Sequence, residues 1–289
     1  MERIEINLPF RPPYEWQAII QFYQSHSIRG VERVTGDSFA RVFRVEDNVG
    51  SIEVRPVVAK SQLEVRIVSE DQKTISETSS RIRKMFDLDC DPELIAKSFE
   101  QIPLLANLCR RVPGLRVARG WDCFETAICT ILGQLVSAGR REHLIGQLVS
   151  NYGEEVVDPS TSKRAYLFPG AEVLASSDLS AIGTTTARRE AIRDFSRRVL
   201  RRAISLAEGQ DPAAFREALL ETKGLGPWSA EYIRLRTGDT DAFPQTDLIL
   251  KRVIELHPDL DLERVKPWRS YAAVYLWKEF AQTLSRNRK

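Results

Sequence analysis

The stretch KGLGPWSAEYI, residues 223–233, combines residue types that could bind a phosphate. Gly224 and Gly226 bracket a leucine, and glycines permit positive backbone angles and leave their amides uncovered. Pro227 suits the first position of a helix, whose N-terminus presents free N–H groups and the positive end of a dipole. An ordinary helical hairpin has the same pattern, so the turn alone leaves both interpretations open.

An aromatic pair and an acid follow this turn. Trp228 and Tyr232 are spaced i, i+4 and therefore share one face of the predicted helix, although such pairs more often belong to a core. Asp247 follows the loop FPQT and precedes a helical pattern. It is either a plain N-cap or, because the helix dipole keeps it ionised, a carboxylate available for chemistry.

Helices on both sides must position these residues. DPAAFREALLETK predicts one helix, with Asp211 as its N-cap and Pro212 in its first turn. A second helix is predicted from Pro227 to about Arg236. The turn of residues 223–226 would then join two short helices, and Asp247 would open a third.

The chain upstream has a different texture. Residues 14–26 show a helical pattern, and residues 28–68 alternate with period two between turn signals, which predicts three or four short antiparallel strands. From about residue 69 amphipathic helical segments continue to the C-terminus. We therefore predict an α+β domain over residues 1–112 and an all-helical domain over residues 113–289.

Composition limits the class of protein. The 289 residues include no apolar run long enough to cross a bilayer, and the start MERIEINLPF does not resemble a signal peptide, so we expect a cytoplasmic location. The four cysteines lack CxxC spacing, which argues against zinc or iron–sulfur sites and for reduced, mostly buried thiols. A net charge of +2 decides nothing about a polyanionic partner. Arginine pairs, more often solvated helix faces than DNA contacts, occur at Arg140 and Arg141, Arg188 and Arg189, Arg197 and Arg198, and Arg201 and Arg202.

The hairpin GLGPWSAEYI followed by DAFPQTD resembles the helix–hairpin–helix superfamily of DNA glycosylases, and within it most closely the AlkA-type DNA-3-methyladenine glycosylase II family. Four further stretches are similar in the same order: PPYEW near the start, FDLDCDP at 86–92, ILGQLVS at 131–137 and KPWRSYAAVYLW at 266–277. The resemblance covers nearly the whole chain. It implies an N-terminal antiparallel sheet domain packed on a helical helix–hairpin–helix core.

The resemblance also implies roles. Asp247 would stabilise the oxocarbenium-like sugar or orient a water while a flipped base leaves. An alkylated base is cationic and would be attracted to aromatic faces. The pocket aromatics would be Trp228, Tyr232, Trp277 and, matching less well, Phe22.

The remaining implied roles concern DNA. Leu135 would fill the vacated base stack, although a leucine buried on an amphipathic helix has the same pattern, and Gln134 would contact the opposite strand. Phosphate contacts would come from Lys223, Gly224, Gly226, Ser229 and Lys251. No cofactor is required, but the main chain of Leu220, Thr222 and Leu225 would be the place for a structural Na⁺ or K⁺ at the hairpin.

One departure from related enzymes favours a single activity. Relatives that also cut the strand place a lysine nucleophile just after the second hairpin glycine, where this chain has Trp228. We therefore expect a monofunctional, monomeric enzyme that acts on damaged double-stranded DNA and leaves an abasic site. Two alternatives stay open: an oxidised-base glycosylase of the same fold, and a non-catalytic helix–hairpin–helix DNA-binding protein.

Overall fold

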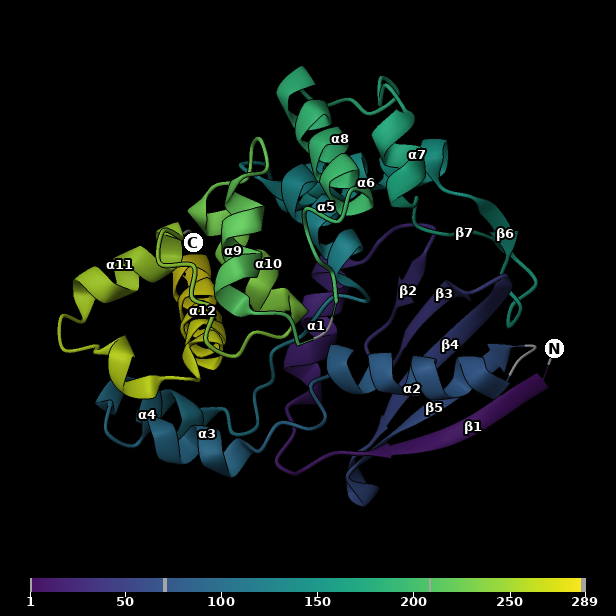
Figure 1. Ribbon diagram of the computed structural model, residues 1–289. Helices are drawn as coiled ribbons and strands as arrows, with labels where there is room; N and C mark the ends of the chain where they lie inside the picture. The colour runs from purple at the N-terminus through teal and green to yellow at the C-terminus, as the bar shows by residue number, and fades with distance from the viewer. Residues whose placement is uncertain (1, 70–71, 208, 287–289) are drawn as a thin grey trace.

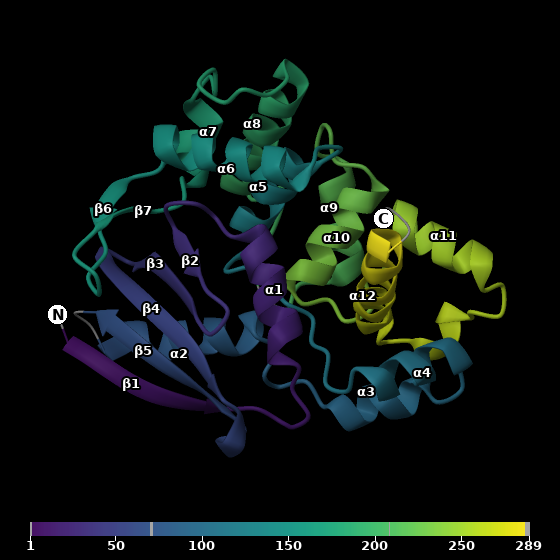
Figure 2. The same cartoon turned by 180° about the vertical axis from the view of Figure 1, so that it is seen from behind.

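The computed structural model describes residues 2–69, 72–207 and 209–286. A twisted antiparallel sheet forms one side of the molecule and helices form most of the rest, with α1 (Trp16–His26) between them (Figures 1 and 2). The predicted α+β class, with an antiparallel sheet before a mainly helical part, is confirmed. No helix within the described residues is long and apolar enough to cross a membrane.

The sheet has five strands in the order β1-β5-β4-β3-β2, all antiparallel. Alternation explains its buried face: Leu63, Val65 and Ile67 on β5 are at most 1% exposed and pack with α1 and α2. Four strands lie between residues 28 and 69, where three or four were predicted, but the fifth strand, β1, was not predicted. The strands are β1 (Glu2–Pro9), β2 (Glu32–Val34), β3 (Phe39–Val45), β4 (Asn48–Val57) and β5 (Gln62–Ser69).

Helices make up most of the remaining chain. They are α2 (Gln72–Met85), α3 (Pro92–Phe99), α4 (Pro103–Arg111), α5 (Cys123–Gly133), α6 (Ala138–Tyr152), α7 (Ala171–Ser176), α8 (Thr186–Leu200), α9 (Pro212–Leu220), α10 (Pro227–Thr237), α11 (Leu248–Leu256) and α12 (Arg269–Arg286), with 3₁₀ turns η1 (Val58–Lys60) and η2 (Leu262–Val265). The prediction that this part is entirely helical was wrong. β6 (Glu155–Val157) and β7 (Arg164–Tyr166) form a two-stranded ribbon, and the Tyr166 amide donates to the Gly30 carbonyl beside β2. Three-residue strands carry too little periodicity to be recognised locally.

The apolar side chains form three clusters, and α10 contributes to two of them. The first joins the sheet to α1 and α2, the second joins α5, α6 and α8 to α10, and the third joins α3 and α4 to α11 and α12. Ile233 of α10 packs in the second cluster and Leu235 in the third. Because α3 and α4 pack with the C-terminal helices, the segment before residue 112 takes part in both halves of the molecule.

The cysteines are free, as predicted. Cys90, Cys109 and Cys129 are buried and Cys123 is partly buried. Burial raises the pKa of the Cys129 thiol well above its usual range, which keeps it protonated and unreactive. No cluster of three or more histidine, cysteine, aspartate or glutamate side chains suited to a metal occurs in the part of the chain that the structure describes.

Candidate active site

A cavity of about 650 Å³ lies where the three clusters meet. Its walls come from α1, α5, α10 and α12 and from the segment 115–121 before α5. The residues that matter for chemistry are Phe22, Trp228, Tyr232, Arg236, Asp247 and Trp277. The predicted catalytic residue and the four predicted pocket aromatics thus line one cavity, although they are far apart in the sequence.

Asp247 is the N-cap of α11, as the sequence allowed. Its Oδ1 accepts hydrogen bonds from the amides of Ile249 (3.0 Å) and Leu250 (3.2 Å). The indole N–H of Trp277 also donates to Oδ1 (3.1 Å), and that of Trp228 donates to Oδ2 (2.9 Å). Four donors therefore hold one half-buried carboxylate at the cavity wall. Asp247 therefore both caps a helix and presents an oriented carboxylate to the cavity.

The aromatic rings surround this carboxylate. Trp228 and Tyr232 stack with centroids 5.0 Å apart and planes 11° apart, as their i, i+4 spacing predicts. Trp277 from α12 lies 6.0 Å from Tyr232, centroid to centroid, at 60°. Phe22 reaches the cavity from α1. The arrangement offers flat apolar faces on which a planar base could stack.

Arg236 is a pocket residue that the sequence interpretation missed. It lies one turn after Tyr232 on α10 and is 7% exposed. Its guanidinium carbon lies 4.0 Å from the centroid of Phe22 and 5.1 Å from that of Tyr232. Arg236 continues the four-residue spacing of Trp228 and Tyr232 and therefore lies on the same helical face. That spacing would have identified Arg236 as a pocket residue.

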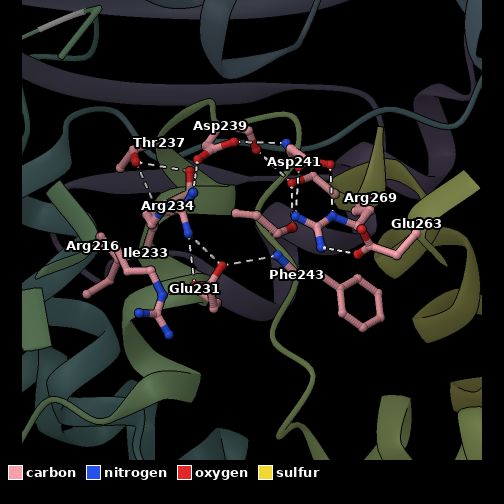
Figure 3. Close-up of polar contacts among 12 residues, drawn as sticks. Arg216, Glu231, Ile233, Arg234, Thr237, Asp239, Asp241, Phe243, Glu263 and Arg269 are labelled. Carbon is pink, nitrogen blue, oxygen red and sulfur yellow. Dashed lines mark hydrogen bonds and ion pairs between the residues drawn. The ribbon is translucent and has the colours of Figure 1, made fainter. Parts of the chain in front are cut away.

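A polar network fixes the loop that delivers Asp247 (Figure 3). Glu231 of α10 accepts from Arg216 Nε (2.6 Å), from Arg234 Nη1 (2.8 and 2.9 Å) and from the amide of Phe243 (3.2 Å). Two residues earlier in the loop, Arg269 of α12 makes a paired contact with the two oxygens of Asp241 (2.9 and 2.7 Å). Paired guanidinium–carboxylate contacts are geometrically specific, so the loop has little freedom to move.

The hairpin between α9 and α10 forms as predicted. Asp211 caps α9 through the Ala214 amide (2.8 Å), and Gly224 adopts a positive φ of 84°. Within the described residues the amides of Gly224 and Gly226 have no hydrogen-bond partner. Free amides beside a helix N-terminus suit a phosphate oxygen.

The predicted phosphate-binding side chains differ in exposure. Lys223 and Lys251 are exposed, whereas Ser229 is 3% exposed and its Oγ accepts from Gln134 Nε2 (2.7 Å). The Ser229 hydroxyl keeps its own O–H proton as a donor, but its burial leaves little surface for a phosphate. The Lys223 amide is held by Asp194 Oδ2 (3.1 Å).

Leu135 is 101% exposed and has a positive φ of 53°. The alternative of a buried core leucine is therefore wrong. A left-handed backbone at a residue with a Cβ costs about 1–2 kcal/mol and persists because hydrogen bonds hold the preceding residue, Gln134. Gln134 Nε2 donates to the Gly224 carbonyl (3.1 Å), and Arg188 Nη2 donates to the Gln134 carbonyl (2.5 Å).

The carbonyls of Leu220, Thr222 and Leu225 lie in one tight turn. The Thr222 oxygen accepts from the Leu225 amide (3.1 Å) and keeps a second lone pair. Carbonyl oxygens are ligands that hard cations prefer, so the donor set fits Na⁺ or K⁺ in kind.

Comparison with known proteins supports this assembly. Residues 5–122 match the AlkA N-terminal domain model. The "Probable bifunctional transcriptional activator/DNA repair enzyme AlkA" of Mycobacterium tuberculosis is 30% identical over 287 residues, which cover 95% of this chain and 56% of that protein. The chain thus spans about half the length of that relative. "DNA-3-methyladenine glycosylase 2" of Escherichia coli is 28% identical over 278 residues, covering 93% of this chain and 95% of that one.

Solved structures agree on the fold. A 3-methyladenine DNA-glycosylase from Archaeoglobus fulgidus superposes with a TM-score of 0.79 at 19% identity, covering 97% of this chain and 99% of that one. MBOgg1 in complex with a low affinity DNA ligand superposes with a TM-score of 0.73 at 21% identity, covering 96% of this chain and 97% of that one. Along nearly its whole length the chain is similar in sequence to the AlkA protein of Mycobacterium tuberculosis and to DNA-3-methyladenine glycosylase 2 of Escherichia coli, and over residues 5–122 to the AlkA N-terminal domain.

Proposed function

We propose that the chain is a monofunctional DNA glycosylase of base excision repair that flips an alkylated base, such as 3-methyladenine, out of duplex DNA and hydrolyses its bond to the sugar. The observation that carries the proposal is the Asp247 carboxylate, held by four donors on the wall of an aromatic cavity. As the bond stretches, positive charge develops on the sugar, and a fixed carboxylate stabilises it. A bare DNA clamp needs neither this carboxylate nor a cavity.

The DNA would be held by its backbone. The free amides of Gly224 and Gly226 and the exposed Lys223 and Lys251 would bind phosphates beside the flipped nucleotide. Leu135, fully exposed, would enter the stack where the base has left. Gln134 would face the opposite strand from the same loop.

No cofactor takes part in this hydrolysis. The carbonyls of Leu220, Thr222 and Leu225 would hold a Na⁺ or K⁺ at the hairpin, where its charge would attract a phosphate. Because its relatives include bacterial DNA-repair proteins, we propose that the protein acts on chromosomal DNA in the cytoplasm, as a monomer.

Base release tests the activity. The protein is incubated with methylated duplex DNA and with a duplex containing 8-oxoguanine, and released bases are identified by chromatography. Release of methylated purines supports the proposal. Release of 8-oxoguanine alone would favour the oxidised-base alternative, and release of neither by a well-folded protein that binds DNA would favour the clamp.

Strand cutting tests the monofunctional assignment. Trp228 stands where strand-cutting relatives place a lysine, and its indole is engaged by Asp247. We expect no borohydride-trapped adduct, with strand breaks only after alkali or heat. Lys278 is the lysine among the cavity-lining residues, so Lys278→Gln is the control. An adduct formed by the unaltered protein and lost in Lys278→Gln would show that this amine is a nucleophile and would overturn the assignment.

A further inference from the structure

The guanidinium of Arg236 is a buried charge without a carboxylate partner. Its residue is 7% exposed, and no ion pair with it occurs among the residues that the structure describes. Its Nε, also buried, has no hydrogen-bond partner there. A buried charge is costly unless it is compensated. Such a residue in a cavity is therefore a candidate for function.

Two contacts hold Arg236 in place. Its Nη1 donates to the Ala118 carbonyl (2.8 Å), and its own carbonyl accepts from the Gly120 amide (3.0 Å). The three rings of Phe22, Tyr232 and Trp277 lie 4.0, 5.1 and 5.6 Å from its guanidinium carbon. The aromatic end of the cavity thus already contains a cation, and a base entering there must lie beside it.

No titratable group that the structure describes near the aromatic end of the cavity neutralises the positive charge of Arg236. His26, stacked on Phe22, has its pKa lowered to about 3 by burial and by the charges of Arg141 and Arg236, so it is neutral. Glu32 and Glu125 also line the cavity, but both are bonded to Arg41. Asp247 carries the remaining negative charge of the cavity wall, and it is held by the two indole groups.

We propose that Arg236 is a specificity-determining residue that stabilises the departing base, while Asp247 stabilises the sugar. This inference rests on the proposed glycosylase activity and adds neutral bases with a carbonyl oxygen to the cationic alkylated bases that the aromatic faces would attract. A neutral base with a carbonyl oxygen on the edge facing Arg236 can accept a hydrogen bond from the guanidinium. A base that is already cationic meets a like charge.

The electron flow of the hydrolysis is consistent with separate roles for Arg236 at the base and Asp247 at the sugar. The bond between C1′ and the base nitrogen breaks, and its electron pair stays on the base. Water adds its oxygen to C1′, and one of its protons ends on the base nitrogen. A neutral base therefore leaves with developing negative charge, spread onto its carbonyl oxygen, and a preorganised cation stabilises that charge. A cationic base leaves neutral and needs no such help.

The test compares two purines in the same duplex, neutral hypoxanthine and cationic 7-methylguanine, under single-turnover conditions. Arg236→Gln keeps a donor for the Ala118 carbonyl and removes the charge. We expect it to slow hypoxanthine release by on the order of 10²-fold and 7-methylguanine release by much less. Arg236→Lys keeps the charge and should retain most of the preference, which also covers the case that Arg236→Gln fails to fold.

Lys278→Gln is the matched control, because it removes one positive charge from the cavity wall without touching the aromatic face that Arg236 covers. It should leave the ratio of the two rates unchanged. Equal slowing of both bases by a folded Arg236→Gln, or no slowing, would overturn the inference. If the unaltered protein releases neither base nor any methylated purine, the glycosylase proposal itself fails.

Discussion

Leu135 has two features that are unfavourable for folding, an exposed apolar side chain and a left-handed backbone. An apolar side chain that is fully exposed on a left-handed backbone stabilises nothing within the protein. The loop is nevertheless fixed, because Gln134 bonds the hairpin and Arg188 bonds the Gln134 carbonyl. The loop is therefore preorganised, and the exposed leucine is available to contact a binding partner.

We expect Leu135→Ala to weaken binding to a damaged duplex more than it slows release from a single-stranded or already destabilised site, because the leucine offsets lost stacking. Stability should not fall, since no buried contact is lost. Leu256→Ala, at another exposed leucine (59%) at the end of α11, is the control. Affinity and single-turnover release measure the two effects. An equal response on both substrates would contradict the wedge role.

The residue types at the site were largely predictable, and their bonds were not. The i, i+4 spacing placed Trp228 and Tyr232 on one face, and the loop before a helix indicated Asp247 as a cap. No local pattern shows that the indoles of Trp228 and Trp277 would both donate to that carboxylate. Those bonds depend on how α10, α11 and α12 pack.

At the scale of elements, helix caps and hydrophobic periodicity predicted most helices and strands. Elements that depend on pairing with distant segments were missed. Helices α9, α10 and α11 begin where Asp211, Pro227 and Asp247 predicted, because caps are local. β1 was missed although its sequence alternates, and it is stable only through its pairing with β5. Glu231 was missed because its contact with the Phe243 amide joins a helix to a distant loop.

Helix α1 makes the pH dependence of stability testable. His26 at its end has a pKa of about 3, lowered by burial and by nearby arginines. The unfolded chain takes up this proton near pH 6.5 and the folded protein only near pH 3, so His26 costs stability as the pH falls between these values.

His26→Gln should remove this cost. The difference in free energy of unfolding, variant minus wild type, should therefore grow in favour of the variant on acidification, by at most about 1.4 kcal/mol per pH unit. Denaturant unfolding at several pH values between about 7 and 4 measures it. A difference that stays constant with pH would show that His26 titrates normally in the folded protein.

At the scale of the whole molecule, a buried charge cluster joins the sheet to the helices. Arg41 of β3 donates to both oxygens of Glu125 on α5 (3.0 and 2.8 Å) and to Glu32 of β2 (2.9 Å). All three side chains are at most 7% exposed. Glu32 and Glu125 line the same cavity as Asp247, so the cluster helps to set how the sheet and the helices enclose that cavity.

Arg41→Met should lower the free energy of unfolding by about 3–5 kcal/mol, because it leaves buried carboxylates without a partner. The matched control is Arg44→Met, which removes an exposed pair with Glu154 and should cost about 1 kcal/mol or less. Denaturant unfolding of the three proteins gives the comparison. Similar losses for the two variants would mean that the Arg41 cluster does not hold the two parts together.

The central claim is that Asp247 carries the chemistry and is not only a cap. Asp247→Asn keeps an oxygen for the amides of Ile249 and Leu250, and asparagine caps as well as aspartate. Its amide group, however, would face the indole N–H of Trp228, so a stability loss of about 1–3 kcal/mol is expected from an unpaired donor. Asp261→Asn, the same change at the N-cap of η2, is the control and should release bases normally.

The decisive measurement is base release from methylated duplex DNA under single-turnover conditions, with DNA affinity and melting temperature measured on the same samples. We predict that Asp247→Asn binds DNA like the unaltered protein and releases bases more slowly by a factor on the order of 10²–10³, since one fixed charge facing the sugar is lost. Release at nearly the unaltered rate by a folded Asp247→Asn protein would contradict the account.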